Sequence, residues 1–98
     1  MIMINRFNVT GDIAEFEQRL EDLSRYMKGQ PGFRSHRLYR SSRTPSTYIE
    51  TAEWTEAASH QRAMTSPDFR ALVGPLMQLA SADPDFFELV EEDHAAVV

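Results

Sequence analysis

Apolar and polar residues alternate along the first segment of the chain. One side of residues 2–9 carries Met3, Asn5, Phe7 and Val9. A period of two is typical of a β-strand, so these four side chains are expected on one face. Asn5 interrupts that apolar face, and a carboxamide buried there needs a hydrogen-bond partner. It is therefore either a ligand-binding group or a structural residue paired with backbone.

The next segment repeats its apolar residues every three or four positions, with charged residues on the opposite side. The apolar positions are Ile13, Phe16, Leu20, Leu23 and Met27. This spacing predicts an amphipathic helix that follows Asp12 as N-cap. The helix is expected to end near Lys28-Gly29, because Gly suits the position after a helix and Pro31 cannot continue it.

Two extended stretches follow, over residues 33–41 and 47–54, and the polar loop 42–46 between them suits a hairpin. A second helical region is expected to begin with Thr55 as its N-cap. It is interrupted at Ser66-Pro67, where the Ser can cap a new helix and the Pro fits its first turn.

That new helix has an apolar stripe formed by Phe69, Leu72, Val73, Leu76 and Leu79. Pro75 is expected to kink it, and Asp83-Pro84 to end it. Residues 85–91 then read as a last strand. Residues 92–98 carry no clear signal and are expected to be frayed or exchanged with a partner chain.

The predicted order is β-α-β-β-α-β, which is the ferredoxin-like α+β arrangement of a four-stranded antiparallel sheet with helices on one face. Residues 1–98 are expected to form a single domain. Both faces of the first and last strands are partly apolar, yet helices cover only one face in this topology. A homodimer joined through the open sheet face is the expected solution.

Composition narrows the class of protein. The 98 residues carry a formal charge of −5 and contain no Cys, which excludes disulfides and thiolate chemistry. The acidic balance argues against nucleic acid as a partner. The first residues lack the basic region of a signal peptide, and no apolar run approaches the roughly 20 residues of a membrane span. A cytoplasmic protein without membrane contact is expected.

Three polar or aromatic side chains are candidates for chemistry besides Asn5. Trp54 shares a strand face with Glu50 and is either a pocket wall that donates its N–H or a core anchor. Glu50 is either a buried carboxylate or a charge paired with Arg37 or Arg40. His60 is either a general base in the second helical region or an exposed helix residue.

Several apolar residues could bind a flat aromatic ligand or simply form the core between helices and sheet. These are Phe7, Tyr48, Met64, Phe69, Leu72 and Leu76. The histidines at 36, 60 and 94 lie on separate elements without the spacing of a metal site. Neither a metal nor an organic cofactor is expected.

Short motifs accompany this order of elements. They are Ile4-Asn5-Arg6-Phe7 in the first strand, Pro31-Gly32-Phe33 after the acidic helix, Glu53-Trp54 at a strand end, and Ser66-Pro67-Asp68-Phe69-Arg70 in the later helix. Over residues 2–91 the chain resembles the antibiotic biosynthesis monooxygenase family of dimeric α+β barrels. The resemblance implies a homodimer whose sheets face each other, with a pocket between sheet and helices in each subunit.

The heme-degrading branch of that family has an Asn on the first strand, which Asn5 matches. The positions of its Trp and its proximal His hold Ala63 and Val73 here. The resemblance to that branch therefore does not extend to heme chemistry.

The branch that oxidises aromatic polyketides without a cofactor has a strand-ending Trp, which Trp54 matches. Glu50 stands where that branch has an Asn, and His60 where it has a Tyr. The resemblance implies a monooxygenase that uses molecular oxygen on an aromatic phenol. In it, Asn5 and Trp54 hold the substrate oxygen and His60 or Glu50 assists proton removal.

Two alternatives remain open. A cyclase or isomerase on the same scaffold would need acid–base groups but no oxygen, and Glu50 and His60 favour it. A binding module would hold a hydrophobic metabolite or heme unchanged.

Overall fold

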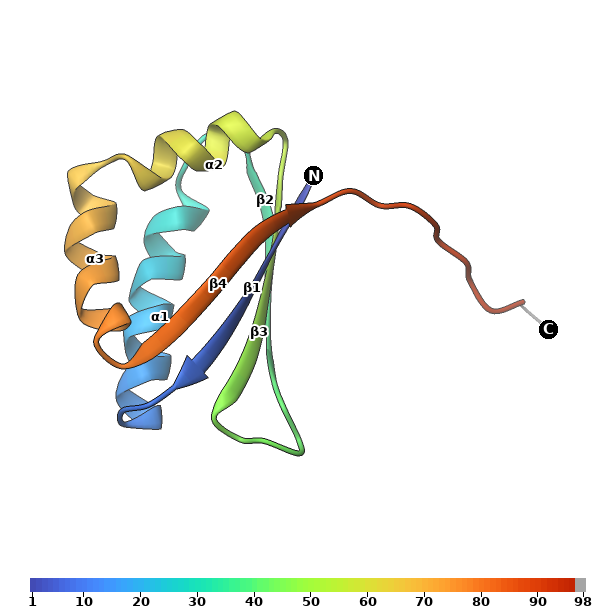
Figure 1. Ribbon diagram of the computed structural model, residues 1–98. Helices are drawn as coiled ribbons and strands as arrows, with labels where there is room; N and C mark the ends of the chain where they lie inside the picture. The colour runs from blue at the N-terminus through green and yellow to red at the C-terminus, as the bar shows by residue number, and fades with distance from the viewer. Residues whose placement is uncertain (97–98) are drawn as a thin grey trace.

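The computed structural model describes residues 1–96 as a sheet with helices on one of its faces (Figure 1). The chain runs through β1 (Ile2–Val9), α1 (Ile13–Lys28), β2 (Phe33–Arg40), β3 (Thr47–Trp54), α2 (Ala57–Met64), α3 (Pro67–Met77) and β4 (Ala80–Phe87). The four strands lie in the order β2-β3-β1-β4, and each neighbouring pair is antiparallel. The predicted ferredoxin-like α+β fold is confirmed.

The helices begin where side chains supply hydrogen-bond partners to the first turn. The Asp12 carboxylate accepts from the Glu15 N–H at 2.8 Å, and the Ser66 hydroxyl accepts from the Phe69 N–H at 3.1 Å. The prediction that Thr55 caps the second helical region is wrong. The N-cap of α2 is Glu56, and the Thr55 N–H instead donates to the Gly32 carbonyl oxygen at 2.8 Å.

The last strand starts earlier than predicted. The helix α3 ends at Met77, two residues after Pro75, and the chain turns directly into β4 at Ala80. The kink at Pro75 stays a prediction. Pro84 lies inside β4 opposite Asn5. A proline lacking its N–H is tolerated at that place because β4 is an edge strand.

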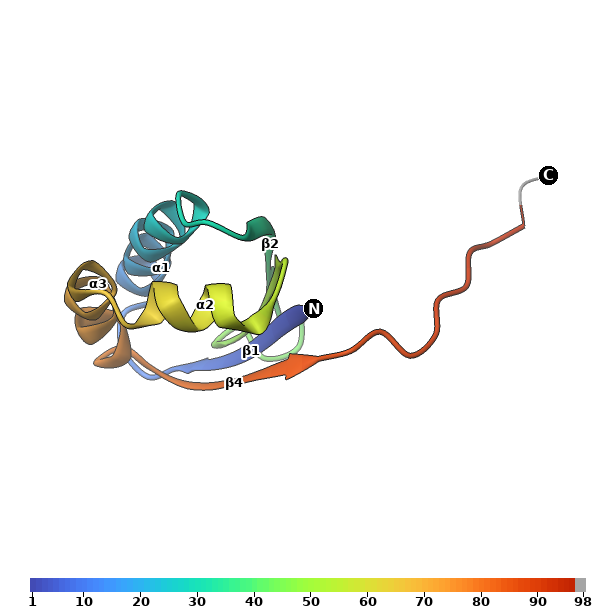
Figure 2. The ribbon, with the colours of Figure 1, turned by 90° about the horizontal axis from the view of Figure 1, so that it is seen from above.

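The end of β4 also differs from the predicted residue 91. Phe87 pairs with Ile2, the first residue of β1, so no neighbouring strand remains for residues 88–91. Residues 88–96 have no regular structure and extend away from the domain (Figures 1 and 2). Exchange of the tail with a partner stays a prediction, and positions 97 and 98 lie outside the described residues.

The buried face of β1 is the predicted one. Met3, Asn5, Phe7 and Val9 are all buried, and Phe16 of α1 is fully buried against Phe7 and Tyr48 at ring distances of 5.2 and 5.0 Å. A second buried cluster around Trp54 lies at the other end of the strands. Figure 2 shows α2 crossing above the space between the sheet and the other two helices. None of the helices in residues 1–96 has the length and hydropathy to cross a membrane.

Candidate active site

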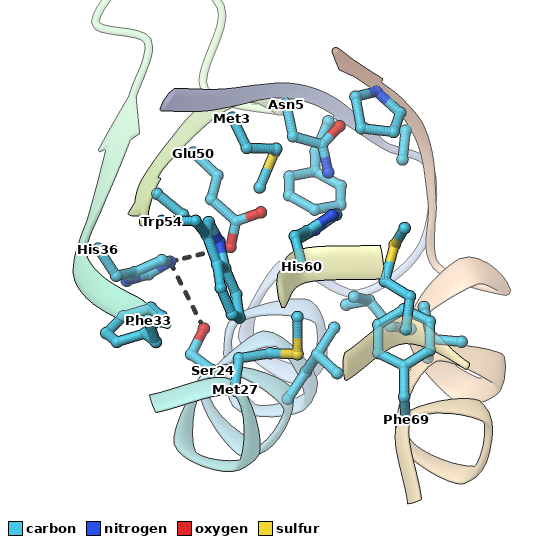
Figure 3. A pocket seen from close by; sticks show the side chains of 18 of the residues that line it. Met3, Asn5, Ser24, Met27, Phe33, His36, Glu50, Trp54, His60 and Phe69 are labelled. Atoms are coloured by element: carbon cyan, nitrogen blue, oxygen red, sulfur yellow. Dashed lines mark hydrogen bonds and ion pairs between the residues drawn. The ribbon is translucent and has the colours of Figure 1, made fainter. Parts of the chain in front are cut away.

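A cavity of about 320 Å³ lies between the sheet and the helices, and every strand and helix contributes to its wall. Its volume is at the lower end of small-molecule sites. Most of its wall is apolar, with a few polar side chains at the end near Trp54 (Figure 3). The structure brings to this wall the predicted residues Asn5, Phe7, Glu50, Trp54, His60, Met64, Phe69 and Leu76.

Tyr48 and Leu72, which we also expected at a ligand site, lie outside this cavity. Tyr48 shares the inner face of β3 with Trp54, but six residues of strand separate them by about 20 Å. Its hydroxyl donates to Glu17. Burial, followed by that hydrogen bond and the Glu17 charge, raises the pKa of the Tyr48 phenol. Leu72 packs against the main core cluster. Both side chains therefore serve the core.

Asn5 is buried and uses one end of its amide for structure. Its Oδ1 accepts from the Asp83 N–H at 3.0 Å, next to Pro84. The amide nitrogen is turned into the cavity, towards His60 (Figure 3). The structural role that the sequence allowed for Asn5 is confirmed for its oxygen, while its amide nitrogen lies at the cavity wall and its role in ligand binding stays a prediction.

Two buried polar atoms at the cavity have no hydrogen-bond partner. They are Nε1 of Trp54 and Nδ1 of His60. The two rings stack edge to face at 5.3 Å, and His60 makes a second edge contact with Phe86 at 4.9 Å. A buried unpaired donor or acceptor costs about 1–3 kcal/mol. Both atoms are therefore available to form hydrogen bonds at this end of the cavity.

His60 is not the exposed helix residue that the sequence allowed, since only 6% of it is exposed. Burial lowers the pKa of His60 below its usual 6.5, and the negative charge of Glu50 offsets part of that shift. The imidazole is therefore neutral at neutral pH, and each of its nitrogens is either a donor or an acceptor.

The lowered pKa of His60 predicts a loss of stability in acid. Below pH 6.5, the unfolded chain binds a proton at this residue that the folded chain does not. The free energy of unfolding should then fall with decreasing pH by at most about 1.4 kcal/mol per unit, until the folded imidazole also titrates. Urea unfolding at a series of pH values measures this slope. His60→Gln should flatten it, whereas His94→Gln, at a position 82% exposed, should leave it as in the wild type.

Glu50 is paired, but not with the arginines considered in the sequence. Its Oε2 lies 2.9 Å from Nε2 of His36, and Oγ of Ser24 lies 3.5 Å from the same nitrogen (Figure 3). His36 was missed because alternation from Phe33 places Ser35 and Arg37, not His36, on its face. A register shift between Phe33 and Ser35 turns His36 inward instead. The bulge has no clear sequence signal. Ser24 was missed because the buried face of α1 was assigned from its apolar residues alone.

No group of three or more His, Asp or Glu side chains is arranged to hold a metal ion within residues 1–96. The polar end of the cavity instead combines a carboxylate, two imidazoles, a carboxamide and an indole N–H. These groups can transfer protons and hold an oxygen atom that becomes negatively charged.

Comparisons with known proteins agree with this architecture. A family model described as antibiotic biosynthesis monooxygenase matches residues 1–74. A deoxynogalonate monooxygenase of Streptomyces nogalater is 32% identical over 84 residues, which are 86% of this chain and 71% of that protein.

Two solved structures resemble this chain in fold. SnoaB, a cofactor-independent oxygenase from Streptomyces nogalater, superposes with a TM-score of 0.89 at 30% identity, over 93% of each chain. A conserved protein of Methanosarcina mazei has a TM-score of 0.73 at 16% identity, over 86% of this chain and 89% of its own. The second likeness shows the fold alone.

Proposed function

Because the chain belongs to the antibiotic biosynthesis monooxygenase family, we propose that it is a cofactor-independent monooxygenase acting on an aromatic, polyketide-like phenol. The likeness to SnoaB, which is a cofactor-independent oxygenase, supports the reaction type. The observation that carries the proposal is the pair of unpartnered atoms, Trp54 Nε1 and His60 Nδ1, at the polar end of an otherwise apolar cavity.

The substrate itself supplies the electrons in this reaction. A hydroquinone or anthrone that has lost a proton is reducing enough to transfer an electron to dioxygen, and the two radicals then combine through a new C–O bond. The protein has to exclude water, remove the proton and stabilise the negative oxygen. Apolar walls suit the first task, and the polar end of the cavity suits the other two.

In the proposed complex, the substrate oxygen lies at the polar end between Asn5, Trp54 and His60. The amide N–H of Asn5 and the indole N–H of Trp54 would donate hydrogen bonds to this oxygen. These hydrogen bonds become stronger as the oxygen becomes negatively charged. Met64 and Phe69 line the apolar part, where the rings of the substrate would pack.

Oxygen uptake tests the proposal, with Asn5 variants as the internal comparison. Metal-free wild-type protein should consume oxygen with anthrones or naphthols. Asn5→Asp retains an acceptor for the Asp83 N–H but loses the donor and places a second carboxylate opposite Glu50 on β3, so it should be less stable and lose about tenfold or more in turnover. Asn5→Ala loses both and should also be less stable, by about 1–2 kcal/mol. Uptake by Asn5→Asp at the wild-type rate would remove this amide from the mechanism.

We also propose that the active form is a homodimer joined through the open face of the sheet. That face carries the half-buried Ile2, Ile4 and Ile49, and the exposed Phe87 adjoins it at the edge. Covering these side chains would remove apolar surface from water. Sedimentation should give twice the chain mass, and a monomer at micromolar concentration would contradict the assembly.

A second function is favoured by one observation. The half-buried pair of Glu50 and His36 supplies an acid–base group without any need for oxygen. A cyclase or isomerase would use the same cavity, but its product would form equally well without dioxygen.

A further inference from the structure

Glu50 is a carboxylate placed among apolar residues of the cavity wall. It lies on β3, one of the two inner strands of the sheet, and the whole residue is 8% exposed. A carboxylate in such a place is unfavourable unless hydrogen bonds or an opposite charge compensate it. Its charge is therefore held there by specific partners.

His36 is the partner that the structure shows at the Glu50 carboxylate. It reaches Glu50 diagonally across the β2–β3 pair, since Glu50 pairs with Leu38 and His36 with Ala52. Its Nε2 is 2.9 Å from the carboxylate, and the exposed fractions of the two side chains are 19% and 11%. Ser24 of α1 contacts the same nitrogen, so two elements fix the imidazole beside Glu50.

The pair lies between two environments. His36 and Ser24 line the apolar cavity and also a polar groove between α1 and β2. The other titratable groups that face the pair are His60 on α2 and, along the groove on α1, Glu17, Glu21, Arg25 and Lys28. Glu50 thus faces the cavity, while His36 is accessible to water from the groove.

We propose that Glu50 is the proton acceptor of this site and that His36 is its positioning residue. This inference rests on the proposed function, which supplies the substrate and the dioxygen. Glu50 removes a proton from an acidic C–H or O–H of the substrate, and the electron pair of that bond stays on the substrate. Dioxygen then adds to the anion through a new C–O bond. The carboxylic acid returns its proton to the terminal peroxide oxygen, so the charges balance and Glu50 is again ionised. At a methylene carbon the hydroperoxide then loses water. The remaining C–H proton leaves, its electron pair forms the C=O bond, and the O–O bond breaks, so that one oxygen atom stays in the product and the other leaves as water.

The contacts favour Glu50 over His60 for this task. His36 compensates the carboxylate, whereas His60 is held between the rings of Trp54 and Phe86 with Nδ1 unpaired. A neutral imidazole in that setting is suited to hydrogen-bond the ligand rather than to carry charge.

Hydrogen–deuterium exchange without oxygen isolates the proton step. An anthrone has an acidic methylene group, and its exchange in deuterated buffer is followed by mass spectrometry under anaerobic conditions. The wild-type protein should accelerate this exchange. Glu50→Gln should reduce the acceleration at least about hundredfold while circular dichroism and anthrone binding, read by Trp54 fluorescence, are retained. Glu50→Asn is a smaller variant for use if the Gln protein does not fold, with the same expected loss.

Glu53→Gln is the matched control. It is the same substitution on the same strand, but Glu53 is exposed on the opposite face and pairs with Arg34 at 3.4 Å. Its exchange rate should equal that of the wild type.

The positioning role of His36 has a separate readout. His36→Phe leaves Glu50 without a partner in the apolar wall, where a carboxylate holds its proton to higher pH. The acid limb of the pH–rate profile should therefore move to higher pH, and kcat should fall with KM unchanged. His36→Gln, whose amide can donate to Glu50, should restore part of the rate. Weaker substrate binding with no shift in the acid limb of the pH–rate profile would mean that His36 has only a structural role.

The outcomes separate this inference from the proposed function. Exchange that depends on Glu50, in a protein that takes up no oxygen, would support the proton acceptor and contradict the monooxygenase. Oxygen uptake that persists at the wild-type rate in Glu50→Gln would overturn the inference and leave the monooxygenase standing. Wild-type protein that binds an anthrone without accelerating its exchange would also overturn it.

Discussion

Replacing Gly32 by Ala should destabilise the protein by about 2–5 kcal/mol. Gly32 has φ +90°, and a Cβ there would lie 2.4 Å from Oγ and 2.5 Å from Cβ of Ser59. The left-handed backbone accounts for about 1–2 kcal/mol and the overpacking for about 1–3 kcal/mol of the expected loss. Ser59 precedes His60 in α2, so its displacement should also weaken ligand binding at the cavity.

Urea unfolding of three variants separates the causes. Gly74→Ala is the control for adding a Cβ without a tertiary clash, because a Cβ at that helical position meets nothing within 4 Å. It should change the free energy of unfolding by less than about 1 kcal/mol, since the gain in helix propensity is opposed by the restriction that Pro75 places on the residue before it. Adding Ser59→Gly to Gly32→Ala should recover only part of the steric loss, because the new Cβ would still lie 2.9 Å from the Thr55 hydroxyl and a glycine within α2 costs about 1 kcal/mol. A Gly32→Ala protein within about 0.5 kcal/mol of the wild type would show that the turn is not packed against α2 in this way.

Replacing Trp54 by Ala should have an effect of similar size, about 3–5 kcal/mol. The residue is 1% exposed, and its indole packs edge to face against Phe33 at 5.4 Å and His60 at 5.3 Å. Its removal eliminates the packing contacts between β2, β3 and α2 at the polar end of the cavity. Thermal and urea unfolding should both show the loss.

Trp54→Phe distinguishes packing from ligand binding. The smaller ring keeps most of the apolar contacts and removes an N–H that has no partner in the ligand-free protein. Its stability should stay within about 1.5 kcal/mol of the wild type. Naphthol affinity, measured by calorimetry, should fall up to about tenfold because one hydrogen bond to the ligand is lost. Unchanged affinity would mean that the indole N–H does not meet the ligand.

The fold was predictable where periodicity and end signals agree. The alternation of residues 2–9 and the Asp12 cap gave β1 and the start of α1 correctly. The bounds of β4 were not predictable in this way. Local signals at Pro84 indicate a chain break, whereas the true limits of the strand depend on its pairing along β1, from Val9↔Ala80 to Ile2↔Phe87.

The candidate site was predictable on β1 and β3 but not on β2. Asn5, Glu50 and Trp54 follow from regular alternation, and all three line the cavity. The partner of Glu50 did not follow, because His36 turns inward only through a register shift whose cause is tertiary. Tyr48 shows the reverse error, since a shared strand face does not imply a shared cavity.

The most direct test of the monooxygenase assignment is the fate of labelled dioxygen. Metal-free protein is given an anthrone under heavy-isotope dioxygen in ordinary water, and the product is analysed at once by mass spectrometry. A monooxygenase should give a product that contains one labelled oxygen atom, at a yield that falls in Asn5→Asp. A rearranged or unchanged product without label, formed equally well in the absence of oxygen, would contradict the monooxygenase assignment.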